Sequence, residues 1–294
     1  MKAEFFLQKI KDAFPDVAWK KYRYLTHGWD HAVIILDDTL VFRMPKDDPK
    51  DLQSNLKNEM QLLRYLKKKG TVGIPNYAFL SKDNSLAGYT LLEGRELSPK
   101  LFRRLSASEK EKFARQLANF ITTLHNTPLS IIKKYKTRKE NNQKNYGWLV
   151  KNTKKYLFPR LNKKETALIK EYLVELKIAL GLNYSNSLVH NDLTWEHILW
   201  DKQKKRVNII DFSDRAFGDP ASDFAGLWEY GSGLVKKVYT LYRGKKDGTL
   251  LYRSKLYFKR IPLFVMKDAL TGSPCTFKDG YKVFKKRFKI IKIS

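Results

Sequence analysis

The segment LVHNDLTWEHILWD, residues 188–201, places ionisable side chains inside an apolar frame. Two histidines, two aspartates and a glutamate lie there among residues such as Leu188, Ile198 and Trp200, which favour burial. A buried carboxylate or imidazole is costly unless it has a partner, and a surface loop would not need so many apolar neighbours. The segment therefore predicts a loop that is anchored in a core and presents polar side chains for a chemical purpose.

A second acidic motif follows in VNIIDFSDRAFGDP, where Asp211 ends a short apolar run. Together with Asp192 in the first loop and His197 five positions later, it forms a pattern typical of phosphoryl transfer. A carboxylate at Asp192 would accept the proton of an attacking hydroxyl. Asp211 would supply the hard oxygen ligand that Mg²⁺ prefers, and the ion would neutralise charge on a triphosphate.

The chain around these motifs divides into a strand-rich beginning and a helical remainder. KYRYLTHGWDHAVIIL and DDTLVFRMP predict two or three strands with turns at Gly28 and Asp37-Asp38. A helix follows, with Gly70 as its C-cap and one apolar face made of Leu56, Met60, Leu63 and Leu66. From Pro99 the spacing becomes helical, and the polar segment 130–145 is interpreted as a loop or a mobile insertion.

Composition limits the remaining possibilities. The chain has 294 residues, 43% of them hydrophobic, and no apolar run reaches the roughly 18–20 residues that a membrane span needs. Cys275 is the only cysteine, so no internal disulfide is possible and a cytoplasmic location fits. The 58 basic and 30 acidic residues give a net charge of +28. No nucleic-acid module accompanies this charge, so we expect non-specific adhesion at low salt and no specific nucleic-acid partner.

The longer motif HNDLTWEHIL…IIDFSDRAFGDPASDFAGL resembles the catalytic core of the aminoglycoside phosphotransferase family, a branch of the protein-kinase fold. The 2''-aminoglycoside phosphotransferases are the most similar group, and VFRMPK, NEMQLLRYL and LANFITTLHNTP resemble further segments of it. The resemblance implies an α+β, two-lobed, kinase-like fold. Residues 1–92 would form a small antiparallel-sheet lobe with one helix, and residues 93–294 a mainly helical lobe, with the hinge at about 88–94. We expect a monomer without a membrane segment.

The resemblance also implies a role for each matching residue. Asp192 would be the catalytic base and Asp211 the main Mg²⁺ ligand. His197 occupies the second metal position, where most of the wider family has asparagine; it would bind the metal directly, reach it through water, or bond nearby backbone. Glu59 would pair with a basic residue that steers the α- and β-phosphates of ATP or GTP. Arg43 matches the usual lysine of that pair, and Lys46 is a second candidate.

Other matching positions would surround these groups. Gly28 would lie in the loop over the phosphates, and Tyr89 and Leu91 in the hinge that contacts the purine through main-chain groups. Asp219 would brace the catalytic loop through backbone hydrogen bonds. His190 is more typical of a structural residue that holds the loop through carbonyl contacts than of a catalytic one.

The acceptor is the least determined part of the sequence. Aminoglycosides are polycations, yet the segment after the last motif, GLWEYGSGLVKKV, has one acid before two lysines. The residues that we expect at the acceptor site are Trp228, Glu229, Tyr230 and Asp268. The first hypothesis is an aminoglycoside O-phosphotransferase. The alternatives are a kinase of the same fold for another alcohol, such as a macrolide or a metabolite, and a non-catalytic nucleotide- or nucleic-acid-binding protein.

Overall fold

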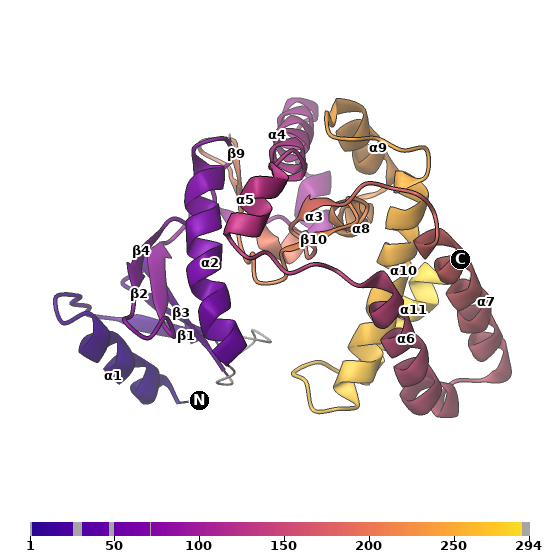
Figure 1. Ribbon diagram of the computed structural model, residues 1–294, viewed down its shortest axis with the longest axis horizontal. Coiled ribbons are helices and arrows are strands. Elements are labelled where there is room, and N and C mark those ends of the chain that lie inside the picture. Colours follow the sequence, from indigo (N-terminus) through magenta and orange to yellow (C-terminus); the bar gives the residue numbers. More distant parts are fainter. Residues whose placement is uncertain (1, 26–30, 47–49, 71, 290–294) are drawn as a thin grey trace.

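The structure is a computed structural model that describes residues 2–25, 31–46, 50–70 and 72–289. It has a smaller lobe built around one sheet and a larger lobe built mainly from helices (Figure 1). The predicted α+β fold with two lobes is therefore confirmed. Where the chain is described, no helix combines the length and the hydropathy needed to cross a membrane.

The sheet of the smaller lobe is antiparallel, with the strand order β1-β2-β3-β5-β4. Its strands are β1 (Tyr22–Leu25), β2 (His31–Leu36), β3 (Leu40–Pro45), β4 (Tyr77–Leu80) and β5 (Ala87–Thr90). β2 and β3 are joined at Asp37 and Asp38, which have φ angles of 48° and 53°. This is the predicted turn, because aspartate tolerates the left-handed region that a tight hairpin requires.

Two helices, not the single one expected, belong to the smaller lobe: α1 (Ala3–Ala13) and α2 (Lys50–Lys67). They lie on opposite faces of the sheet (Figure 1). Phe6 and Ile10 of α1 are buried against Ile34 and other residues of one face, whereas the apolar stripe of α2 joins Ile35 of the other face. Because strand side chains alternate between faces, the unbroken apolar run of β2 serves both helices.

The chain crosses to the larger lobe after β5. β6 (Arg95–Glu96) pairs with β8 (Ile198–Asp201), which in turn pairs with β9 (Arg206–Ile209). The crossing therefore falls in residues 91–94, inside the predicted hinge, while the lobe boundary itself stays a prediction. Gly94 has a φ of +107°, and a Cβ there would lie 2.7 Å from the backbone of Trp200, so glycine is required.

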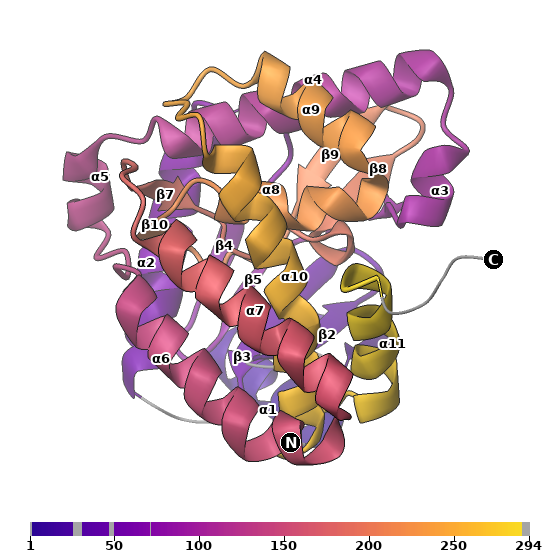
Figure 2. The ribbon, with the colours of Figure 1, turned by 90° about the vertical axis from the view of Figure 1, so that its right-hand side faces the viewer.

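Helices form most of the larger lobe (Figure 2). Its longer helices are α4 (Ala107–His125), α6 (Asn142–Asn152), α7 (Lys163–Leu180), α9 (Ser232–Leu241), α10 (Leu250–Ala269) and α11 (Phe277–Arg287). Shorter ones are α3 (Pro99–Arg103), α5 (Leu129–Lys134) and α8 (Ser222–Ala225). The segment 130–145, interpreted from sequence as a loop or mobile insertion, contains most of α5 and the start of α6, and Lys139 forms a β-bridge with Phe217.

One hydrophobic cluster extends from α2 and the first sheet into the larger lobe. It includes Leu63 of α2, Leu117 of α4 and Leu188, which lies in β7 (Ser187–Val189). β7 pairs with β10 (Ala216–Gly218), so the chain segments that precede Asp192 and follow Asp211 lie side by side. The pairing of strands β7 and β10 thus brings the two sequence motifs together.

Candidate active site

The loop that carries Asp192 begins where β7 ends and is fixed by a buried carboxylate. Asp223 of α8 accepts hydrogen bonds from the backbone N–H groups of His190 (3.0 Å) and Asn191 (2.8 Å). Asn191 has a φ of 69°, so these bonds hold a left-handed turn directly before Asp192. As expected, His190 is structural: it is fully buried and donates from Nε2 to the carbonyl oxygen of Ile210 (3.0 Å).

The prediction that Asp219 braces this loop was wrong. Its carboxylate instead accepts from Arg253 at 2.7 and 2.9 Å and from the hydroxyl of Tyr257 at 2.7 Å, all within the larger lobe. Asp219 and Asp223 are four positions apart, and sequence spacing does not determine which of them faces the loop. The short helix α8 places Asp223 there.

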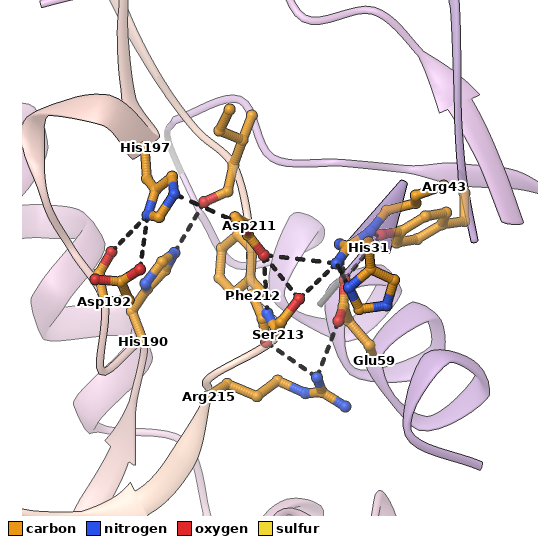
Figure 3. Close-up of polar contacts among 12 residues, drawn as sticks. His31, Arg43, Glu59, His190, Asp192, His197, Asp211, Phe212, Ser213 and Arg215 are labelled. Atoms are coloured by element: carbon orange, nitrogen blue, oxygen red, sulfur yellow. Dashed lines mark hydrogen bonds and ion pairs between the residues drawn. The ribbon is translucent and has the colours of Figure 1, made fainter. Parts of the chain in front are cut away.

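Asp192, His197 and Asp211 meet at the predicted catalytic position (Figure 3). The 3₁₀ turn Trp195–His197 folds the chain back, and His197 donates from Nδ1 to the backbone carbonyl of Asp192 (2.8 Å). The same nitrogen lies 3.3 Å from Asp192 Oδ2, and Nε2 lies 3.8 Å from Asp211 Oδ2. Because a carbonyl only accepts, Nδ1 carries a proton. Burial acts to lower the pKa of His197, but the charges of Asp192 and Asp211 outweigh it and raise that pKa, so Nε2 has a lone pair for a metal only in the neutral ring.

Electrostatics differ sharply between the two carboxylates. Burial, with further contributions from Asp214, Asp211 and Glu196, raises the pKa of Asp192 to about 6. Burial acts on Asp211 in the same direction, but the nearby charges of Arg43 and His197 overcome it and hold the pKa of Asp211 below its usual range. One carboxylate is therefore poised to exchange a proton near neutral pH, while the other stays ionised.

Arg43, and not Lys46, pairs with Glu59. The guanidinium of Arg43 donates from Nη1 to Glu59 (3.0 Å) and Tyr77 (2.9 Å), and from Nη2 to Ser213 (2.5 Å). Lys46 follows the last residue of β3 and is half-buried. Because Arg43 also lies 3.5 Å from Asp211, it connects the smaller lobe with the second acidic motif (Figure 3).

Sequence reasoning did not identify His31 as part of this cluster. Its Nδ1 lies 3.2 Å from Arg43 Nη2 and accepts the hydrogen bond, since a guanidinium can only donate. Burial, and secondarily the charge of Arg43, lower the pKa of His31 to about 3. His31 is the first described residue after Gly28, and the phosphate loop predicted at Gly28 lies outside the described residues.

The purine contacts predicted for Tyr89 and Leu91 stay predictions, and the structure shows how each residue is held. Tyr89 is buried in β5 with its ring edge-on to Tyr77, and burial raises the pKa of Tyr89 to about 12. The N–H of Leu91 is not available to a purine because it donates to the carbonyl of Thr39 (2.7 Å). A main-chain contact of Leu91 with a purine would therefore have to use its carbonyl group, and that contact stays a prediction.

Comparison with known proteins agrees with this geometry. Residues 21–244 match the sequence profile of the phosphotransferase enzyme family. The chain belongs to this family. The predicted membership and the prediction of a kinase-like phosphotransferase are thereby confirmed.

Solved structures show the fold that this phosphotransferase shares. An aminoglycoside 2''-phosphotransferase in complex with GDP and kanamycin has a TM-score of 0.87 at 22% identity, with 98% of this chain and 99% of that chain covered. A gentamicin complex of another 2''-phosphotransferase has a TM-score of 0.72 at 20% identity, covering 99% and 97%. The macrolide 2'-phosphotransferase apoenzyme from Brachybacterium faecium has a TM-score of 0.65 at 18% identity, covering 99% and 100%.

The four residues predicted for the acceptor site are already engaged with protein groups. Trp228 donates from Nε1 to Ser254 (3.0 Å), and Glu229 forms an ion pair with Arg287. Asp268 accepts from its neighbour Lys267 (2.9 Å).

Tyr230 is the least suited of the four. Its hydroxyl donates to the carbonyl of Leu97 (2.8 Å), and its ring packs edge-on against Phe102 and Phe113. It therefore acts mainly in core packing, and we leave it out of the acceptor site proposed below.

Two further acids, Glu140 and Glu196, lie near Asp192. Glu140 accepts from the side chain of Asn191 (3.4 Å) and from Arg138 (3.1 Å), and Arg138 also lies 3.6 Å from Asp214. Sequence reasoning missed Glu140 because its segment was interpreted as a loop. Glu196 stood inside the opening motif and could have been found from that position.

Proposed function

We propose that this phosphotransferase moves the γ-phosphate of ATP or GTP to a hydroxyl group of an aminoglycoside in an Mg²⁺-dependent reaction. The observation that carries the proposal is the meeting of Asp192 and Asp211 on two sides of His197. One carboxylate has its pKa raised to about 6 and the other is held ionised. A proton acceptor and a cation ligand at neighbouring positions are what phosphoryl transfer to an alcohol requires.

Asp192 would act on the acceptor. Its carboxylate takes the proton of the attacking hydroxyl as the oxygen approaches the γ-phosphorus, and a pKa of about 6 keeps most of it unprotonated at neutral pH. The bonds from His190 and Asn191 to Asp223 fix the backbone on which it stands. Orientation of the base is thus built into the larger lobe.

The residues fit a magnesium ion whose remaining ligands would be oxygens of the nucleotide. Asp211 offers an ionised carboxylate, and His197 offers Nε2 while its other nitrogen is held by a backbone carbonyl. Among the described residues, no group of three or more His, Cys, Asp and Glu side chains could hold a metal by itself. Mg²⁺ commonly takes one or two protein ligands plus phosphates and water, and when bound it would neutralise charge on the triphosphate.

The nucleotide would lie between the lobes. Arg43 and Glu59, together with Lys46, would border the phosphates, and Tyr89 and the side chain of Leu91 would border the base. The proposal leaves ATP and GTP as equal candidates: related solved structures of 2''-phosphotransferases hold GDP in one case and ADP in another.

Acidic residues favour an aminoglycoside as the acceptor. Glu196 is close enough to Glu96 and Glu229 for both to raise its pKa, with burial as the main cause. These carboxylates come from separate segments of the chain. Folding therefore brings together acidic residues that no single stretch of the sequence contains. With Trp228 and Asp268 they form the proposed acceptor site, which would attract the ammonium groups of a polycation.

Another alcohol is the second candidate. The net charge of +28 disfavours recruitment of a polycation, and both Glu229 and Asp268 are already paired with cations. Macrolide 2'-phosphotransferases share the fold, with TM-scores of 0.65 and 0.64. A macrolide or a metabolite alcohol would therefore fit the same catalytic centre with fewer acidic contacts.

Nucleotide turnover by the purified protein tests the proposal. The assay combines Mg²⁺ with ATP or GTP and a panel of aminoglycosides, macrolides and no acceptor. Stimulation by an aminoglycoside is expected, and Asp192→Asn and Asp211→Asn should each lower kcat by at least about 100-fold. Asp201→Asn, which removes a carboxylate from the β8–β9 turn of the same lobe, is the matched control and should stay active.

Full activity in either site variant would refute the assigned chemistry. Stimulation by macrolides alone would move the acceptor to the second candidate while keeping Asp192 as the base.

A further inference from the structure

Glu59 is held by two arginines, one from each lobe. Its Oε1 accepts from Arg43 Nη1 (3.0 Å) and from the hydroxyl of Tyr77 (2.8 Å). Its Oε2 accepts from Arg215 Nη1 (3.0 Å), and this arginine stands in the larger lobe within the second acidic motif (Figure 3). Glu59, Arg43 and Arg215 are each at most 4% exposed. The pair with Arg43 was predicted from the resemblance to the family, whereas the contact with Arg215 was not predicted.

Arg215 also closes the turn that carries Asp211. Its backbone N–H donates to the carbonyl of Phe212 (3.2 Å), and its Nη1 donates to the same oxygen (3.0 Å). Asp211 has a φ of 58°, and its Oδ1 accepts from the hydroxyl of Ser213 (2.7 Å). One guanidinium nitrogen therefore bonds both a side chain of α2 and the backbone of the turn.

Charge balance makes this contact specific. The buried cluster contains two cations, Arg43 and Arg215, and one anion, Glu59. The partly exposed carboxylate of Asp211 lies at its edge, 3.5 Å from Arg43. Removing Arg215 would leave the buried Glu59 carboxylate with one arginine in place of two. Such a loss inside the protein is more costly than the loss of a surface ion pair. A lysine could keep the charge but would lose the planar geometry by which Arg215 reaches both oxygens.

We infer that Arg215 is a positioning residue that couples the placement of helix α2 to the conformation of the Asp211 turn. It belongs to neither the nucleotide site nor the acceptor site proposed above. It acts by holding Glu59, and through it Arg43, in register with Asp211. The catalytic consequence rests on the proposed function, whereas the mechanical coupling between α2 and the turn does not.

Two variants of Arg215 and one control test the inference. Arg215→Lys keeps the charge, and Arg215→Met removes it. Arg253→Lys is the control, because Arg253 is equally buried and ion-paired, with Asp219 and Asp247, but lies entirely within the larger lobe. Amide hydrogen exchange in α2 is measured for each protein, followed by kcat, the KM for Mg-nucleotide and the KM for the acceptor.

We expect Arg215→Met to raise exchange in residues 56–67 of α2 at least tenfold and to lower kcat/KM for the nucleotide at least tenfold. The KM for the acceptor should stay within twofold of its original value. Arg215→Lys should recover part of both losses. Arg253→Lys should leave α2 exchange and nucleotide kinetics unchanged, even where its thermal stability falls.

The inference would be overturned if α2 of Arg215→Met exchanged its amide hydrogens at the rate of the unaltered protein. It would also be overturned if Arg253→Lys raised the exchange rate of α2 as much as Arg215→Met does. Should Arg215→Met fail to fold, the comparison of Arg215→Lys with Arg253→Lys decides by the same criterion. Should the unaltered protein lack turnover with every acceptor, the proposed function fails. The exchange data still decide whether Arg215 couples α2 to the turn.

Discussion

At the scale of single residues, the site depends on buried polar groups that are held by specific partners. Asp223 is an example: besides the two backbone N–H groups it accepts from Nε2 of His125 (3.0 Å), whose Nδ1 faces the hydroxyl of Tyr242 (2.8 Å). Each oxygen of a fully buried carboxylate thus has a donor. Such a group is a sensitive point for substitution, because an isosteric change can remove an acceptor without changing shape.

Asp223→Asn should impair both stability and activity. The amide group would present N–H where His190, Asn191 or His125 already donates, so one bond becomes a donor–donor contact. We expect a loss of about 2–4 kcal/mol in unfolding free energy, measured by denaturant titration. kcat should fall at least tenfold because the backbone before Asp192 loses its anchor. Unchanged kcat in the folded variant would show that the brace is dispensable for catalysis.

At the scale of elements, local sequence signals set the helix ends. α7 begins with a reciprocal cap in which Asn162 accepts from the N–H of Glu165 (2.9 Å) and the Glu165 carboxylate accepts from the N–H of Asn162 (3.1 Å). The same carboxylate accepts from the hydroxyl of Tyr281 in α11 (2.5 Å). A residue chosen for a cap therefore also joins two helices.

Asn162→Ala should test how far this cap acts alone. We expect a loss of about 1 kcal/mol in unfolding free energy, as for other caps, with turnover unchanged because α7 contributes no residue to the site around Asp192. Asn162→Asp, which keeps an acceptor oxygen, is the matched control and should retain most of the stability. A fall in kcat for the alanine variant would indicate that α7 communicates with the catalytic loop.

At the scale of the whole molecule, charge is the dominant property. The net charge of the chain is +28, which is much larger than the negative charge of the few acidic residues near Asp192. Interactions between exposed charges are screened beyond about 8–10 Å at physiological salt. The cations on distant helices therefore influence binding of an acceptor less than the nearest carboxylates do.

The charge predicts salt-sensitive adhesion to polyanions. We expect the protein to bind an arbitrary RNA or DNA duplex at about 50 mM salt and to release it by about 200 mM, because the affinity comes from counterion release. A mobility-shift titration across salt, with two unrelated sequences, measures this. Retention of one sequence but not the other at the higher salt would contradict the expectation of purely non-specific binding.

The sequence by itself determined the features that are local in the chain. The lobes, the strand turn at Asp37-Asp38 and the apolar face of α2 follow from residue patterns within a few turns or strands. The pair of motifs around Asp192 and Asp211 could also be predicted, since acids beside apolar runs are costly without a purpose. Local periodicity and burial cost act over short stretches, and the sequence displays them directly.

Only the tertiary structure decided which distant groups meet. The contact of Arg215 with Glu59 spans 156 positions, and that of His31 with Arg43 depends on strand register. The choice of Asp223 over Asp219 depends on the direction of one short helix. Hydrogen bonds require partners within about 3 Å, so contacts between remote segments become fixed only when packing sets the relative positions of sheets and helices.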